Sequence, residues 1–144
     1  MVSSQLSCVY LNVSNLDRSI DFYKTVLEKE VEVRYKNLWA QFRICDHFTL
    51  GLLCPAFDKA IIESGQDLSP HYDIEFIHNF TDEIIQGNSV VLNLSTTDIK
   101  NEYERIKSLG PKKISNIMYV NFMYPYRFFL VEDPDGNVLE IAES

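Results

Sequence analysis

The chain has 144 residues, of which 46% are hydrophobic and 12% aromatic, enough to fill a packed core, so the composition excludes a disordered chain. The formal net charge of −8 repels phosphate backbones and argues against nucleic-acid binding. Charged or polar residues interrupt every apolar run before the roughly 20 residues that a membrane helix needs. The three cysteines have no CxxC spacing, which argues against a disulfide framework and a structural zinc site.

Residues 8–13 alternate in polarity, which predicts a half-buried strand with one face made of Cys8, Tyr10 and Asn12. Residues 16–27 then change to helical spacing, with an apolar stripe formed by Leu16, Ile20, Tyr23 and Leu27. Ser14 or Asn15 is suited to cap this helix. Strand-like stretches follow at 31–35, 38–44 and 48–54, and the tight turn Asp46-His47 joins the last two.

The second half repeats this order, because "LNLS" at 92–95 follows "LNVS" at 11–14. A strand is predicted over 89–95 and a helix after it, with a stripe formed by Ile99, Tyr103, Ile106 and Leu109, and Gly110-Pro111 ends the helix. Strand-like stretches follow at 114–123, 126–132 and 137–143, the last two joined by the turn 133–136. Overlaying the copies without gaps places Cys8 on Ser89, Asn12 on Asn93 and Asp17 on Asp98.

Each half therefore has the order β-α-β-β-β, and the predicted fold class is α+β. We expect two βαβββ modules that form a curved mixed-sheet cup with the helices on its convex face. The whole chain, 1–144, is expected to be one domain, with a first module over about 5–55, a link over about 56–88 and a second module over about 89–143. A short strand or helix is expected in the link around 71–80.

The segments "VSNLDRSIDFYKTVL" and "FLVEDPDGNVLEIAE" resemble the vicinal oxygen chelate superfamily. That superfamily includes glyoxalase I, extradiol dioxygenases, and fosfomycin- and bleomycin-resistance proteins. In its metal-dependent members, the resemblance implies one ligand on the first strand and one on the last strand of each half, usually His, Gln or Glu. The divalent ion polarises vicinal oxygens of the substrate as a Lewis acid.

Carried onto this chain, the four ligand positions implied by the resemblance fall on Cys8, Gly51, Ser89 and Glu140. Only Glu140 is a usual ligand, and a shift of two residues in the second half replaces Ser89 by Val91, which is a worse one. His47 lies in a predicted turn, and the other two histidines lie in the link. The sequence therefore predicts no metal cofactor, with a divalent metal as the alternative.

The predicted cup is lined by residues that share the strand face opposite the helices. They are Cys8, Tyr10, Asn12, Trp39, Gln41, Arg43, Asn93, Tyr126, Phe128, Leu130 and Glu140. Aromatic walls with a few amide and charged groups suit an organic ligand with planar groups. The alternative is that these aromatic side chains fill a dimer interface or the cup itself. Cys8 is expected to be a buried, inert thiol, because no histidine shares its strand face.

These expectations favour a metal-free small-molecule-binding protein of the glyoxalase/bleomycin-resistance type that sequesters a cationic or aromatic drug. The resemblance implies a homodimer. Whether the protein is an enzyme stays open; the alternative is a metal-dependent lyase like glyoxalase I, or a related enzyme such as a dioxygenase, with Glu140 as its one candidate catalytic residue. The N-terminal stretch has no basic region before its apolar part, so the cytoplasm is the expected location.

Overall fold

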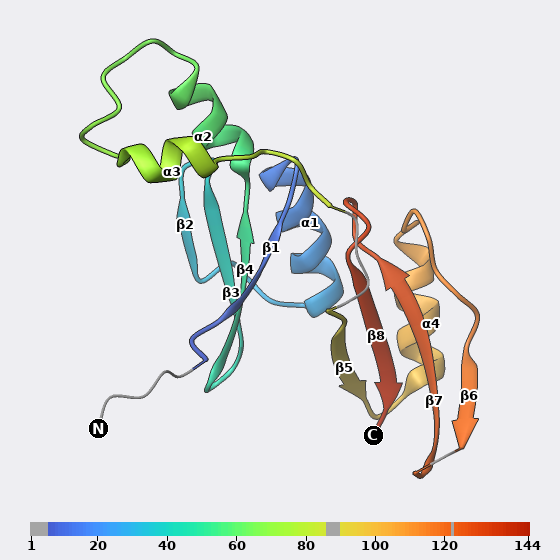
Figure 1. Ribbon diagram of the computed structural model, residues 1–144. Helices are drawn as coiled ribbons and strands as arrows, with labels where there is room; N and C mark the ends of the chain where they lie inside the picture. The colour runs from blue at the N-terminus through green and yellow to red at the C-terminus, as the bar shows by residue number, and fades with distance from the viewer. Residues whose placement is uncertain (1–5, 86–89, 122) are drawn as a thin grey trace, which may run out of the picture. The chain divides into compact units, whose positions relative to one another are not determined.

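The computed structural model describes residues 6–85, 90–121 and 123–144. The chain divides into two compact units, residues 1–84 and 85–144, referred to as the first and second units. Each unit contains a four-stranded mixed sheet and a helix in the order β-α-β-β-β (Figure 1), which confirms the predicted α+β class and the repeat. The cup shared by both sheets and the single-domain organisation stay predictions.

The first unit begins with β1 (Val9–Asn12), α1 (Leu16–Leu27), β2 (Val33–Tyr35), β3 (Trp39–Cys45) and β4 (Phe48–Leu53). Its strands lie in the order β1-β4-β3-β2, with β1 parallel to β4 and the other pairs antiparallel. The two-residue turn between β3 and β4 is the predicted one. A parallel pair needs a crossover, and α1 lies within the connection from β1 to the sheet.

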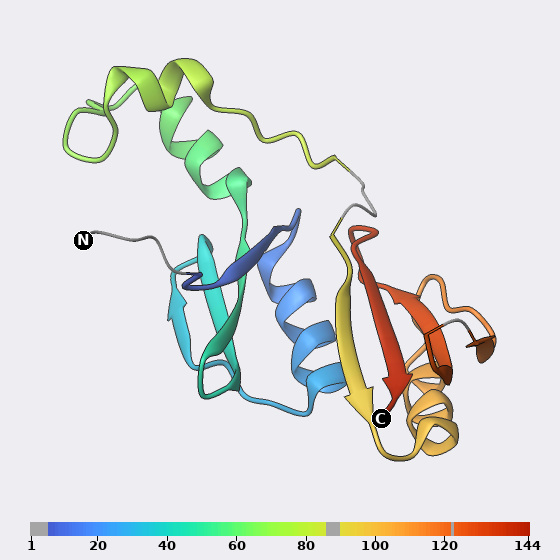
Figure 2. The same ribbon diagram turned by 60° about the horizontal axis from the view of Figure 1, so that its bottom comes forward.

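One face of this sheet packs against α1 and forms the core of the first unit (Figure 2). Asn15 caps the helix, because its side-chain oxygen accepts a hydrogen bond of 3.0 Å from the Arg18 amide. The helix and sheet then bury Tyr23, Phe42 and Leu52 completely. Burial of large apolar side chains supplies most of the stabilising free energy, so this face of the sheet holds the first unit together.

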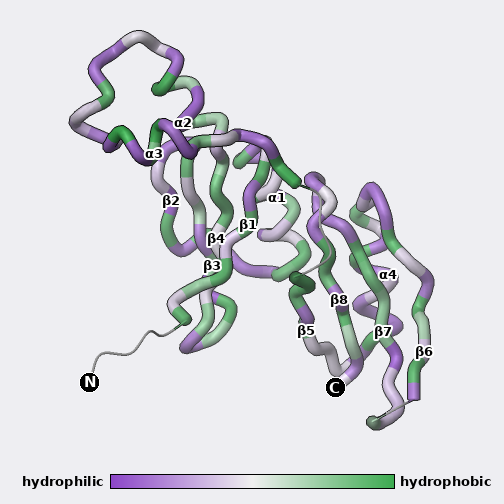
Figure 3. The backbone as a smooth tube through the Cα atoms, in the orientation of Figure 1, coloured by the Kyte–Doolittle hydropathy of each residue, from purple (hydrophilic) through white to green (hydrophobic). Residues whose placement is uncertain are grey.

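Two short helices follow β4, α2 (Pro55–Ile62) and α3 (Ile74–Asn79). The structure thus confirms a short element around 71–80, as α3, whereas α2 was not predicted, although a proline is favoured in the first turn of a helix. The Tyr72 hydroxyl donates a hydrogen bond of 2.7 Å to Asp58 of α2. The Tyr72 ring also stacks on Phe76 of α3, with centroids 5.0 Å apart. In Figure 3, α3 carries both hydrophobic and hydrophilic residues.

The second unit contains β5 (Leu92–Thr96), α4 (Ile99–Ser108), β6 (Met118–Asn121), β7 (Pro125–Glu132) and β8 (Val138–Glu143). Its sheet order, β5-β8-β7-β6, repeats the first unit, with β5 parallel to β8. Its core joins α4 to the sheet, since Tyr103 meets Phe129 edge-on with centroids 5.0 Å apart. Leu109 is not part of the buried stripe as predicted: it is the C-cap residue and is 44% exposed.

The turn between β7 and β8 is built around the completely buried Asp133. Its carboxylate accepts hydrogen bonds from the Asp135 amide at 2.9 Å, the Asn137 amide at 2.8 Å and the Asn137 side chain at 2.7 Å. Gly136 has φ of 87°, a conformation that favours glycine. These contacts fix the start of β8 and therefore the register that carries Glu140.

The two copies superpose with a shift of two residues from the overlay without gaps. The helix caps are Asn15 and Asp98, so Asp98 is the counterpart of Asn15 and not of Asp17. The ladders agree, because Tyr10 pairs with Gly51 and Asn93 pairs with Glu140. The gap-free overlay was therefore wrong in this region. The structural counterpart of Cys8 is Val91, the alternative weighed from the sequence.

None of the helices in the described part of the chain has the length and apolar character that spanning a bilayer requires.

Candidate functional site

The sheet face of the first unit opposite α1, here called the open face, carries a tryptophan that covers a glycine. A Cβ atom placed on Gly51 would lie 2.2 Å from Cη2 of the Trp39 indole, so no side chain fits at position 51 while the indole stays there. Tyr10 meets the indole edge-on, with ring centroids 5.7 Å apart at an angle of 67°. This is a favoured aromatic geometry.

A chain of polar contacts fixes the orientation of the indole. Trp39 Nε1 donates to Gln41 Oε1 at 3.2 Å, and Gln41 Nε2 donates to Glu32 Oε1 at 3.1 Å. Glu32 also accepts two hydrogen bonds from Arg43, at 2.9 and 3.1 Å. The hydrogen bonds from Arg43 and then Gln41 hold the pKa of Glu32 below its ordinary value, and Glu32 in turn raises the pKa of Arg43.

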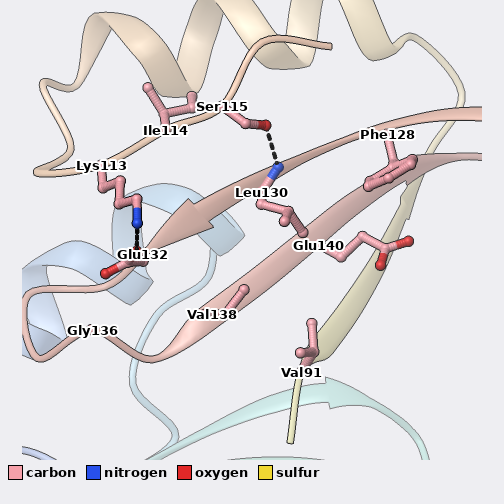
Figure 4. A pocket seen from close by; sticks show the side chains of 10 residues that line it. All are labelled: Val91, Lys113, Ile114, Ser115, Phe128, Leu130, Glu132, Gly136, Val138 and Glu140. Carbon is pink, nitrogen blue, oxygen red and sulfur yellow. Dashed lines mark hydrogen bonds and ion pairs between the residues drawn. The ribbon is translucent and has the colours of Figure 1, made fainter. Parts of the chain in front are cut away.

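The second unit has a pocket on the corresponding face of its own sheet (Figure 4). Its volume is about 750 Å³, within the usual range of small-molecule sites. It is called the Glu140 pocket below. The residues that line it are Val91, Lys113, Ile114, Ser115, Phe128, Leu130, Glu132, Gly136, Val138 and Glu140.

The polar groups of the Glu140 pocket differ in how they are satisfied. Lys113 Nζ lies 3.2 Å from a carboxylate oxygen of Glu132, so these two charges neutralise each other. Ser115 Oγ accepts a hydrogen bond of 2.9 Å from the Leu130 amide. Glu140 Oε1 accepts a hydrogen bond of 3.0 Å from Asn93 Nδ2. In Figure 4, the Glu140 carboxylate lies toward Phe128 and away from the Lys113–Glu132 pair.

The structure brings part of the predicted lining together. Phe128, Leu130 and Glu140 line one pocket, and Asn93 contacts Glu140 from the neighbouring strand. Tyr126 lies on β7 of the second unit, with its ring centroid 5.5 Å from that of Phe128. The other predicted residues belong to the first unit, where the open face holds Tyr10, Trp39, Gln41 and Arg43. Asn12 is exposed at the end of β1. Cys8, which was expected to be buried, is half-buried just before β1.

Sequence reasoning missed the wall of the pocket formed by residues 113–115. This segment runs along β7, because the Ser115 amide donates to the Leu130 carbonyl at 2.9 Å and the Glu132 amide donates to the Lys113 carbonyl at 3.0 Å. A single bridge pairs Ile114 with Val131. The run "KKIS" shows little of the alternation between polar and apolar residues that is typical of a strand. Only the strand predicted over 114–123 included part of this segment.

The family's metal positions can be tested unit by unit. In the first unit they fall on Cys8 and Gly51, and the second of these has no side chain and is covered by Trp39. In the second unit they fall on Glu140 and on Val91, which has no donor atom; the earlier assignment, Ser89, lies outside the described residues. Across residues 6–85, 90–121 and 123–144, no three His, Cys, Asp or Glu side chains group closely enough to hold an ion. The donor set does not fit a divalent metal.

A sequence model of the Glyoxalase/Bleomycin resistance protein/Dioxygenase superfamily matches residues 5–141, and the chain belongs to this superfamily. One relative is the uncharacterized protein YwbC of Bacillus subtilis (strain 168). It is 26% identical over 132 residues, which cover 91% of this chain and 90% of that protein.

Solved structures share the fold over nearly the whole chain. Lactoylglutathione lyase from Agrobacterium tumefaciens superposes with a TM-score of 0.64 at 18% identity, covering 99% of this chain and 96% of that chain. TnmS3, an antibiotic binding protein from Streptomyces sp. CB03234, superposes with a TM-score of 0.65 at 18% identity, covering 99% of this chain and 98% of that chain. At this identity the similarity shows the fold, which both an enzyme and a binding protein use.

Proposed function

We propose that this protein binds a small organic molecule without a metal ion. The observation that carries the proposal is the indole of Trp39 over Gly51, because it fills the place where a ligand side chain would stand in a metal-dependent relative. The counterpart of Cys8, Val91, likewise offers no donor. Glu140 alone is insufficient to hold a divalent ion against water.

The ligand we propose is a cationic or aromatic drug that the protein sequesters, as the sequence predicts. Two features support this choice. The pocket of about 750 Å³ combines the apolar Phe128 and Leu130 with few polar groups. The net charge of −8 attracts cations and speeds their capture.

Metal analysis of protein purified without chelator tests the metal-free state. We expect less than about one tenth of an equivalent of nickel, zinc, manganese or iron, because the donor set is incomplete. Stoichiometric metal that is lost in Glu140→Gln would contradict the proposal.

Calorimetric titration with bleomycin, with and without its bound copper, tests the proposed drug class. Binding with a dissociation constant of about micromolar or below is expected for a sequestering protein. Absence of binding at micromolar protein would remove bleomycin as the ligand, while other cationic aromatic compounds would remain to be titrated in the same way.

A metal-dependent lyase is the second candidate, favoured by the retention of Glu140 at a family ligand position and by the similarity to lactoylglutathione lyase. The measurement is turnover of the methylglyoxal–glutathione adduct with each divalent metal added. Turnover abolished by Glu140→Gln would establish this candidate, whereas no metal-stimulated turnover is expected for a binding protein.

We further propose that the protein acts in the cytoplasm as a homodimer, as the resemblance to its superfamily implies. Light scattering behind a sizing column measures the mass directly, and the monomer mass of 16.7 kDa makes the two states easy to separate. A single species at the monomer mass over micromolar concentrations would contradict the dimer.

A further inference from the structure

The two carboxylates of the Glu140 pocket are in different electrostatic states. Glu132 forms an ion pair, since Lys113 Nζ lies 3.2 Å from its carboxylate. Glu140 receives one amide hydrogen bond from Asn93, and the described residues of the second unit give it no lysine, arginine or histidine partner. Within those residues, the pocket therefore holds one carboxylate without a paired cation, at a defined place.

The surroundings of that charge are apolar and aromatic. Leu130 lies directly opposite Glu140 in the β7–β8 ladder, and Phe128 lies one diagonal step along the same face. In Figure 4 the Glu140 carboxylate lies on the Phe128 side of the pocket. A cation placed there would meet a carboxylate and an aromatic ring together, two interactions that favour positive charge.

Asn93 adds orientation to this arrangement. Its amide donates to one oxygen of Glu140, which restrains the carboxylate and leaves the other oxygen to accept a hydrogen bond from a ligand. An acceptor held in place in this way loses less conformational entropy on binding than a free side chain.

From these contacts we propose that the Glu140 pocket selects a monocationic amine attached to a flat apolar body. The ammonium pairs with Glu140 beside Phe128, and the apolar part packs on Leu130 and Val138. This inference rests on the proposed function and deepens it, because it names the chemical class of the ligand and the residue that distinguishes it from a neutral analogue.

A pair of matched probes tests the proposal on the full chain. 2-Naphthylmethylamine is protonated at about pH 7, and 2-naphthylmethanol has a similar shape without the charge. Calorimetry or NMR titration should show the amine binding about tenfold tighter than the alcohol, the difference expected for one charge-assisted hydrogen bond. Equal affinities, or no binding of the amine at millimolar concentration, would overturn the inference.

Two substitutions separate the specific contact from general charge. Glu140→Gln and Glu132→Gln change the formal charge of the pocket equally, yet of the two only Glu132 has a cation partner among the described residues of the second unit. We expect Glu140→Gln to remove the preference for the amine and Glu132→Gln to retain it within about twofold. An equal loss of the preference for the amine in both variants would contradict the inference. Phe128→Leu should lower amine binding about two- to fivefold and alcohol binding less.

Circular dichroism of each variant establishes that it is folded before titration. Failure of the inference is distinguishable from failure of the proposed function. A metal-free protein that binds bleomycin but does not prefer the amine loses only the ligand class. A stoichiometric metal removed with Glu140 contradicts the proposed function itself.

Discussion

The open face of the first unit and the Glu140 pocket of the second unit are built on equivalent ladders of two separate sheets, but a ring covers one and the other is hollow. Gly51 and Glu140 are counterparts, since they pair with Tyr10 and Asn93 of the first strand in each unit. Trp39 and Phe128 are counterparts on the adjoining strand. In one unit a large indole lies over a residue without a side chain, and in the other a carboxylate extends from the same place into a hollow.

The difference shows that one position can set the character of a whole sheet face. A glycine allows the neighbouring aromatic ring to lie over the backbone, and Gln41 Oε1 then fixes the ring by accepting a hydrogen bond from Trp39 Nε1. On the first face the indole of Trp39 covers this position, whereas on the second face the position borders the Glu140 pocket.

The turns preceding these positions give the largest expected effect. Asp133→Ala removes a buried carboxylate that accepts hydrogen bonds from the amides of Asp135 and Asn137, and takes this acceptor away from both amides. We expect the free energy of unfolding to fall by about 2–4 kcal/mol, measured by urea denaturation. Asp46→Ala, in the exposed turn of the first unit, is the matched control and should cost about 0.5 kcal/mol or less.

Asp133→Asn refines this test, because an amide oxygen can still accept the two backbone hydrogen bonds. Its cost should lie between those of the two alanine variants. Equal losses for Asp133→Ala and Asp46→Ala would mean that the buried carboxylate does not fix the second hairpin.

A smaller effect is expected where the indole covers Gly51. Gly51→Ala places a methyl group into the space of Trp39 Cη2, so the indole must move, at about 1–3 kcal/mol. The same substitution in a Trp39→Ala background should cost about 0.5 kcal/mol or less, giving a coupling energy between the two positions. Additive costs in the two backgrounds would mean that the ring does not rest on this residue.

Trp39 is the only tryptophan in the chain, so its emission reports the same event directly. Gly51→Ala should move the emission to longer wavelength as the ring becomes more exposed. An unchanged spectrum together with an unchanged stability would contradict the proposed packing.

Much of this arrangement could be predicted from the sequence, because it depends on periodicity. The alternation in residues 8–13 and 126–132 placed Tyr10, Phe128 and Leu130 on the face opposite the helices, where the structure has them. The signatures around Asp17 and Asp133 identified the superfamily that the whole-chain match shows. Alternation identifies a face without specifying which side chains touch.

The rest depends on contacts that local patterns do not encode. The two halves were aligned with an error of two residues because "LNVS" and "LNLS" are nearly identical, whereas the helix caps Asn15 and Asp98 give the correct register. Gly51 was seen as a missing ligand, but its contact with Trp39, twelve residues away in the chain, is a diagonal one across the β3–β4 ladder. The salt bridge of Lys113 with Glu132 likewise joins a loop to a strand.

The smallest expected effect is the response of the open face to low pH. Glu32 has its pKa lowered by hydrogen bonds from Arg43 and Gln41, and it holds Gln41 against Trp39. A carboxylate whose pKa is lowered by folding stabilises the folded state at any pH above its pKa in the unfolded chain. That contribution disappears as the pH falls through its pKa in the folded protein. Trp39 emission should therefore stay constant from about pH 7 to the ordinary value of 4.5 and change only below it.

Two variants decide whether this acid step belongs to the open face. Glu32→Gln should abolish it, because a neutral amide at this position does not titrate. Glu143 is the matched control in the second unit: Arg127 lowers its pKa by the same kind of pairing, through hydrogen bonds from its side chain and its amide. Glu143→Gln should leave the Trp39 acid step unchanged. A step that persists in Glu32→Gln would show that the indole responds to acid through some other group, and that the polar chain on the open face does not hold it.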